Sequence, residues 1–122
     1  MKIILASKSG VRKKILDQNN IESQVVGSNV NEDEVKVSLL AEGASPMLIS
    51  KNLAELKANK VSSKTPDQIV LGADSVIDIG GELISKPKSR DEAFEILQKL
   101  NGKKHQLISS VCISKNGSMI WN

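Results

Sequence analysis

With 122 residues, of which 39% are hydrophobic and 25% charged, the chain has the size and composition of one globular domain, which excludes disorder for most of its length. The net charge of +3 comes from scattered basic residues and only 2% of residues are aromatic, so stable nucleic-acid binding through a basic stripe or an aromatic platform is not expected. No apolar run is long enough for a signal peptide or a membrane span.

The first residues predict the opening of an α/β unit. Residues 3–6 form a short apolar run, which is typical of a buried parallel strand. A Ser/Gly loop follows at residues 7–10, and three apolar residues then recur at helical spacing: Val11, Ile15 and Leu16. Residues 22–26 predict a second strand. A strand, a loop of small residues and a helix in this order indicate an α/β protein.

The next part of the chain predicts a loop and then a long helix. We interpret the acidic stretch at residues 31–34 as a loop. Ser45 and Pro46 are typical of a helix start, because Ser caps the free amide groups and Pro suits the first helical position. We expect this helix to run to about residue 60. Its apolar residues are Leu48, Leu53, Ala54 and Leu56.

A strand and a hairpin are predicted after this helix. Residues 69–73 form another apolar run, and we expect the strand to end at Asp74. Residues 76–79 and 82–84 flank Gly80-Gly81 and predict a β-hairpin. Residues 89–92 fit a capping box, so a helix should begin there and stop at Gly102.

Asn116-Gly117 predicts a second hairpin, formed by residues 107–113 and 118–121. Cys112, the only cysteine, lies in its first strand and is expected to be buried. One cysteine excludes a disulfide within the chain and indicates a reducing compartment. His105, the only histidine, should pack at the start of this strand, and a multi-histidine zinc site is excluded. Antiparallel hairpins combined with βα units predict an α/β fold with a mixed, elongated, twisted sheet flanked by helices.

Two short segments carry candidate chemistry. Ser7, Ser9 and Arg12 lie between a strand end and a helix start, where free amide groups, the helix dipole and a guanidinium favour a phosphate. The alternative is an exposed helix start with solvated basic residues. Asp74 can hold a hard divalent cation or act as a general base, and Glu32 can supply a second carboxylate. The alternatives are a strand-end turn and a solvated acidic loop.

Five modest motifs occur in an order that resembles the Maf-like nucleoside triphosphate pyrophosphatases. Residues 5–13 resemble the family's N-terminal signature, Leu-Ala-Ser-x-Ser-Pro-Arg-Arg. Residues 53–58 are similar to its Leu-Ala-x-x-Lys-Ala helix, and residues 72–75 to its Gly-Ala-Asp-Thr. Residues 85–97 resemble Gly-Lys-Pro followed by Glu-Ala-x-x-x-Leu, and residues 100–105 resemble Leu-Ser-Gly-x-x-His. The resemblance covers nearly the whole chain, so we expect residues 1–122 to form a single Maf-like domain.

The resemblance implies an activity and a fold. The activity is hydrolysis of a nucleoside triphosphate to the monophosphate and pyrophosphate by a cytoplasmic enzyme that uses Mg²⁺ or Mn²⁺ and is often a homodimer. Members of the family remove nucleotides unsuited to nucleic acid and are linked to cell-division arrest. The implied fold is the elongated α/β fold shared with inosine triphosphate pyrophosphatase.

The resemblance also implies roles for individual residues. Asp74 matches the catalytic base and metal carboxylate, and Glu32 matches a second metal ligand. The residues that match the binding site for the triphosphate are Ser7, Ser9, Arg12, Lys57 and Lys86.

The chain departs from the family pattern at two specificity positions and at its end. Val11 replaces the first Arg of the signature and Ser75 replaces the Thr after the Asp, so the preferred base is open between dTTP or UTP, CTP, 7-methyl-GTP and others. The family's C-terminal portion, with its Asp-Lys-Ala-Gly motif, is expected to be missing. The alternative function is therefore a catalytically impaired remnant that binds a nucleotide or a partner.

Overall fold

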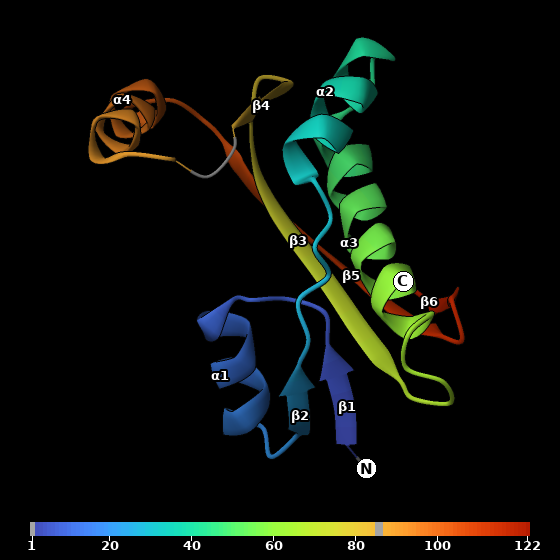
Figure 1. The fold of residues 1–122 in the computed structure, drawn as a ribbon. Helices are drawn as coiled ribbons and strands as arrows, with labels where there is room; N and C mark the ends of the chain where they lie inside the picture. Colours follow the sequence, from blue (N-terminus) through green and yellow to red (C-terminus); the bar gives the residue numbers. More distant parts are fainter. Residues whose placement is uncertain (1, 85–86) are drawn as a thin grey trace.

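The computed structural model describes residues 2–84 and 87–122. The elements in these two ranges (Figure 1) are β1 (Lys2–Leu5), α1 (Gly10–Gln18), β2 (Glu22–Val25), α2 (Glu32–Ala41), α3 (Pro46–Ser62), β3 (Val70–Ile79), β4 (Glu82–Ile84), α4 (Arg90–Leu100), β5 (Gln106–Lys115) and β6 (Ser118–Trp121). The predicted helices and hairpins are therefore present. In the same ranges, no helix is both long and apolar enough to cross a membrane.

The sheet is mixed, as the sequence predicts. Its strand order is β2-β1-β3-β5-β6, with β4 paired to β3 beside this path. β1 runs parallel to β2 and to β3, whereas β4 and β5 both run antiparallel to β3. The two ten-residue strands β3 and β5 pair along most of their length and give the molecule its long axis (Figure 1). The α/β class with an elongated mixed sheet is confirmed.

One edge of β3 is paired at both ends but not in its middle. β1 pairs with Val70 and Leu71 at one end of β3, and β4 pairs with residues 77–79 at the other. Among the described strands, none pairs with this edge between these two points. The opening contains Asp74, and it lies where the chain leaves β1 for the Ser/Gly loop. Open α/β sheets place ligands at such points, where neighbouring strands diverge.

Helix α3 packs directly on β3 through small residues. Alternate residues of a strand face the same side of the sheet, so Gly72, Asp74 and Val76 share the side that α3 covers. A Cβ added to Gly72 would lie 2.8 Å from the Ala58 Cβ and still closer to the Ala54 carbonyl oxygen. The absent side chain therefore allows the close approach of the helix that brings Lys57 to the sheet.

Two sequence predictions about this region are wrong. The acidic stretch 31–34 is not a loop: the Asn31 side chain caps α2 by accepting from the Glu34 amide at 3.2 Å. Acidic residues are favourable in a first helical turn because they face the positive end of the helix dipole. In addition, β3 does not end at Asp74 but continues to Ile79, because β5 pairs with it on both sides of that residue.

In the C-terminal half, one prediction about a side chain is confirmed and another is wrong. Cys112 is buried between the sheet and α3, as expected. His105 lies just before β5 with an exposed side chain, so it does not pack at the strand start. Helix α4 lies apart from the other helices (Figure 1), and none of its described residues is buried.

We expect Cys112 to resist thiol reagents in the folded protein. Burial raises the pKa of the Cys112 thiol above its ordinary value, although a hydrogen bond with Ser114 opposes this shift and the Glu55 charge adds to it. Labelling with a chromogenic disulfide should be at least about a hundredfold slower in buffer than in urea, because reaction requires local opening. Since the folded-state pKa exceeds the unfolded one, the thiol should lower stability only as the pH rises above the ordinary thiol pKa. Equal labelling rates in both solvents would contradict this expectation.

Candidate functional site

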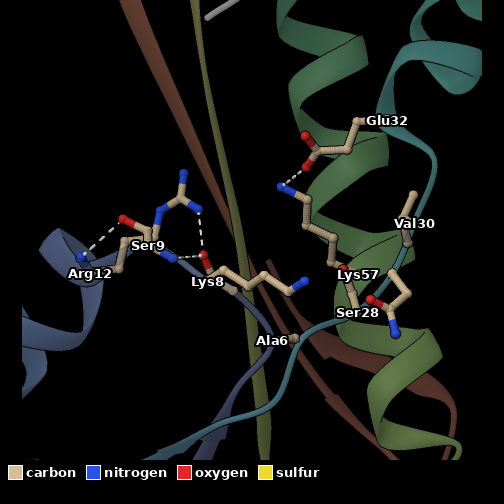
Figure 2. A pocket seen from close by; sticks show the side chains of 10 residues that line it. Ala6, Lys8, Ser9, Arg12, Ser28, Val30, Glu32 and Lys57 are labelled. Carbon is tan, nitrogen blue, oxygen red and sulfur yellow. Dashed lines mark hydrogen bonds and ion pairs between the residues drawn. The ribbon is translucent and has the colours of Figure 1, made fainter. Parts of the chain in front are cut away.

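A polar pocket of about 350 Å³ lies where the loop after β1 meets α2 and α3 (Figure 2). Three segments that are distant in the sequence line it: the β1–α1 connection, the segment between β2 and α2, and the facing surface of α3. The lining residues are Ala6, Ser7, Lys8, Ser9, Arg12, Ser28, Asn29, Val30, Glu32 and Lys57. Three of them are cations and one is an anion, so the pocket is suited to a negatively charged ligand.

The first wall is the Ser7–Arg12 loop, and its own hydrogen bonds fix its shape. The Ser9 hydroxyl caps α1 by accepting from the Arg12 amide at 3.3 Å. The Ser7 hydroxyl accepts from the Ser9 amide at 3.2 Å and from Arg12 Nη1 at 2.9 Å. The remaining first-turn amides have no acceptor within the helix by geometry, and the helix dipole adds positive potential there. The loop could therefore accommodate an anion such as a phosphate.

The opposite wall contains Lys57, a buried cation held by two carboxylates. Its side chain is 8% exposed and its Nζ lies 3.2 Å from both Asp74 Oδ1 and the Ala73 carbonyl oxygen. The same ammonium also contacts Glu32 Oε1 from the first turn of α2 (Figure 2). A buried charge is tolerated only when it is paired and hydrogen-bonded, and Lys57 meets both conditions.

Asp74 lies behind Lys57 rather than on the pocket wall. Its side chain is 8% exposed, and the residue is not among those that line the pocket. Its Oδ1 accepts from Lys57, but its Oδ2 is buried and has no hydrogen-bond partner among the residues that the structure describes. Leaving a carboxylate oxygen unsatisfied in the interior is costly and is uncommon outside functional sites. The Asp74 position is therefore suited to a partner that residues 2–84 and 87–122 do not supply.

The carboxylates fit a divalent cation in combination with a substrate. In the described ranges, no group of three or more His, Cys, Asp or Glu residues is arranged to hold a metal ion by itself. Mg²⁺ is usually bound through one or two carboxylates together with substrate phosphates and water. Asp74, with its unpartnered oxygen, and Glu32, 40% exposed at the pocket, provide such a pair.

The structure brings together most of the sequence-predicted site residues, but not all of them. Ser7, Ser9, Arg12, Lys57 and Glu32 line the pocket, and Asp74 contacts Lys57 behind it. Val11 is 69% exposed on α1 and does not line the pocket.

Ser75, the second candidate specificity residue, does not line the pocket. Ser75 follows Asp74 in the strand, so it faces the other side of the sheet, where its hydroxyl lies 2.9 Å from the Ser109 hydroxyl. Lys86 lies outside the described residues.

Sequence reasoning missed two parts of the pocket. Lys8 lines it, and its stem crosses Gly27 so closely that a Cβ there would lie 2.6 Å from Lys8 Cε. Ser28 and Asn29 line it from the segment after β2, and Lys60 of α3 fixes this segment by donating to the Asn29 carbonyl at 2.8 Å. The Gly-Ser-Asn sequence was a signal, since such residues form ordered turns beside ligands.

A Maf-like protein family model matches residues 2–122 of the chain. The chain is 70% identical over 120 residues to a nucleoside triphosphate pyrophosphatase of Pelagibacter ubique (strain HTCC1062), covering 98% of this chain and 62% of that protein. It is 44% identical over 119 residues to a nucleoside triphosphate pyrophosphatase of Ruegeria sp. (strain TM1040), covering 98% and 60%. It is also 37% identical over 121 residues to a 7-methyl-GTP pyrophosphatase of Brucella abortus biovar 1, covering 99% and 61%. The chain thus spans about three-fifths of the length of these relatives.

Proposed function

This chain belongs to the Maf-like protein family, and we propose that it is a nucleoside triphosphate pyrophosphatase. The proposed reaction adds water to the α-phosphorus and breaks the α–β phosphoanhydride bond, giving a nucleoside monophosphate and pyrophosphate. The observation that carries this proposal is the buried Lys57–Asp74 pair, with its unpartnered carboxylate oxygen, beside a cationic serine loop. The names of the relatives support the same reaction class.

The serine loop is the proposed binding site for the triphosphate. The Arg12 guanidinium is fixed by Ser7, so its remaining N–H groups can donate to phosphate oxygens with little loss of conformational entropy. Lys8 adds a flexible ammonium on the same wall. Lys57 faces them across the pocket, and the family resemblance adds Lys86 to this set. Phosphoryl transfer depends mainly on such positioning and charge neutralisation.

Asp74 is the proposed general base. Its Oδ2 can accept a proton from the water that attacks the α-phosphorus, and in the nucleotide-free structure Lys57 holds its Oδ1. The Ser50 hydroxyl supports this geometry by donating to the Asp74 carbonyl oxygen at 3.1 Å. Asp74 and Glu32 would together hold a Mg²⁺ or Mn²⁺ ion. When bound, such an ion neutralises phosphate charge and lowers the pKa of coordinated water.

The proposal extends to the biological setting. We place the protein in the cytoplasm, where it would remove non-canonical or excess nucleotides. Its activity would be linked to cell-division arrest. The proposed assembly is a homodimer. Val11 and Ser75 remain the candidate specificity positions from the family resemblance, although neither lines the pocket. The relatives do not single out one nucleobase of the substrate, because they carry the names of both a nucleoside triphosphate pyrophosphatase and a 7-methyl-GTP pyrophosphatase.

Product analysis across a substrate panel tests the proposal. The folded protein would be incubated with dTTP, UTP, CTP, GTP or 7-methyl-GTP in the presence of Mg²⁺ or Mn²⁺. We expect a monophosphate and pyrophosphate from at least one of them, which also identifies the base. A diphosphate and orthophosphate would indicate a different reaction. Nucleotide binding without any product would favour the alternative function, a binding protein without turnover.

We expect Lys8→Met to raise the KM for the preferred triphosphate about tenfold with little change in kcat. The ammonium would contact phosphate equally in the ground and transition states, and a charge-assisted hydrogen bond contributes free energy of this order. Lys14→Met is the matched control, because Lys14 is an exposed lysine of α1 outside the pocket lining. An unchanged KM in Lys8→Met, or an equal rise in both variants, would remove Lys8 from the binding site.

A further inference from the structure

Lys57 separates the pocket from the carboxylate behind it. Its side chain lines the pocket, while its Nζ reaches past the wall to Asp74 Oδ1 at 3.2 Å. Asp74 itself does not line the pocket, and its Oδ2 has almost no solvent-accessible surface. In this arrangement the Asp74 Oδ2 is shielded from water, and the Lys57 side chain lies between Asp74 and the pocket.

The Lys57 ammonium also contacts the two carboxylates that would hold a divalent cation. It contacts a carboxylate oxygen of Asp74 and one of Glu32, the two groups best placed to hold such an ion. Two cations cannot share this small space, because unit charges a few ångströms apart in a partly buried site repel strongly. The ammonium and a metal ion are therefore competitors for the same pair of carboxylates.

We propose that Lys57 acts as a built-in substitute cation that closes the metal site in the nucleotide-free protein. The inference rests on the proposed function for its trigger: the polyphosphate of a bound nucleotide offers the Lys57 ammonium other oxygens across the pocket. When Lys57 turns toward them, Asp74 and Glu32 are left with excess negative charge and the Asp74 Oδ2 becomes reachable. Divalent-cation binding then follows nucleotide binding, which restricts the assembled site to the substrate complex.

The test measures metal binding without a nucleotide. Mn²⁺ would be titrated into the purified protein, and the free ion would be followed by electron paramagnetic resonance. Lys57→Met keeps the length of the side chain but removes the competing charge. We expect it to bind Mn²⁺ at least about tenfold more tightly than the wild type, since removal of a unit charge at ion-pair distance has an effect of this order or larger.

Three further variants make the outcome decisive. Lys51→Met, an exposed position on the same helix, should leave the Mn²⁺ affinity at the wild-type value. Lys57→Met combined with Asp74→Asn should lose the gain, because the gain depends on the Asp74 carboxylate. If Lys57→Met does not fold, Lys57→Gln should show the same rise in Mn²⁺ affinity. Its amide can still donate to Asp74 but carries no charge.

Equal or weaker Mn²⁺ binding after removal of the Lys57 charge would overturn the inference. The measurement uses neither nucleotide nor turnover, so its failure is distinct from a failure of the proposed function. A protein that hydrolyses triphosphates but shows no gain in Lys57→Met would retain the function and lose the substitute-cation role. If Lys57→Met binds Mn²⁺ more tightly but the wild type hydrolyses no triphosphate, the substitute-cation role would stand and the proposed function would fall.

Discussion

Replacing Asp74 with Asn should lower the rate of pyrophosphate release by at least about a hundredfold, which is the usual contribution of a positioned general base. The substitution keeps the size and shape of the side chain but removes the charge and the proton-accepting oxygen at the buried centre of the site. Lys57 would keep its contacts with Glu32 and the Ala73 carbonyl, so the fold should survive. Pyrophosphate release and thermal unfolding, measured on the same samples, separate the two effects.

Asp78→Asn is the control for Asp74→Asn. Asp78 lies four residues further along β3, and its carboxylate accepts from the Gly81 amide at 2.7 Å in the hairpin turn. Asn can accept the same hydrogen bond, so we expect the activity to stay near the wild-type value. A folded Asp74→Asn variant with wild-type turnover would remove Asp74 from the mechanism, as would equal losses in the two variants.

The largest effect on stability is expected from Gly72→Ala. The added Cβ would overlap the backbone of α3, with 2.9 Å to the Ala58 amide nitrogen and 2.8 Å to the Ala58 Cβ. Neither atom can rotate away, so the helix must shift from the strand. Overpacking of this kind costs about 1–3 kcal/mol and sometimes more. The shift would also move Lys57 away from Asp74, so urea unfolding and activity should both deteriorate.

Gly10→Ala provides the matched comparison for Gly72→Ala. Gly10 is the first residue of α1, and a Cβ there would meet no atom within 4 Å. Alanine also restricts the unfolded chain, so this variant should be unchanged or stabilised by up to about 1 kcal/mol. If Gly72→Ala unfolded at the same urea concentration as the wild type, the close packing of α3 on β3 would be contradicted.

The sequence predicts the elements better than it predicts where they end. Apolar runs, Ser45-Pro46 and the two glycine-containing turns locate strands, helix and hairpins correctly, because these signals act within a few residues. The end of β3 depends instead on β5, which is separated from it in the sequence by β4 and α4 and pairs on both sides of Asp74. Non-local pairing of this kind leaves no signal in the strand's own residues.

The start of α2 carries a local signal for a helix. Asn31 followed three residues later by Glu34 has the spacing of a helix cap, and Asn31 does cap the helix. The acidic composition suggested a solvated loop, but the helix dipole makes the same composition favourable in a first turn. Glu32 is consequently placed by a helix rather than by a loop.

The candidate site illustrates the same division between local and non-local information. Lys57 lies on the buried face of α3, four residues from both Leu53 and Val61, and this spacing identifies it as a lysine directed toward the core. Its two carboxylate partners come from different elements, and only the tertiary structure brings them together. The part that Lys8 plays in the pocket likewise depends on the absent side chain of Gly27 on another segment.

Hydrolysis in water enriched in ¹⁸O tests the central claim most directly. The folded protein would be incubated with its preferred triphosphate and a divalent cation, and both products would be analysed by mass spectrometry. Attack on the α-phosphorus predicts that one ¹⁸O atom appears in the nucleoside monophosphate and none in the pyrophosphate. Label in the pyrophosphate, release of orthophosphate in its place, or no hydrolysis of any triphosphate would contradict the proposed function of this site.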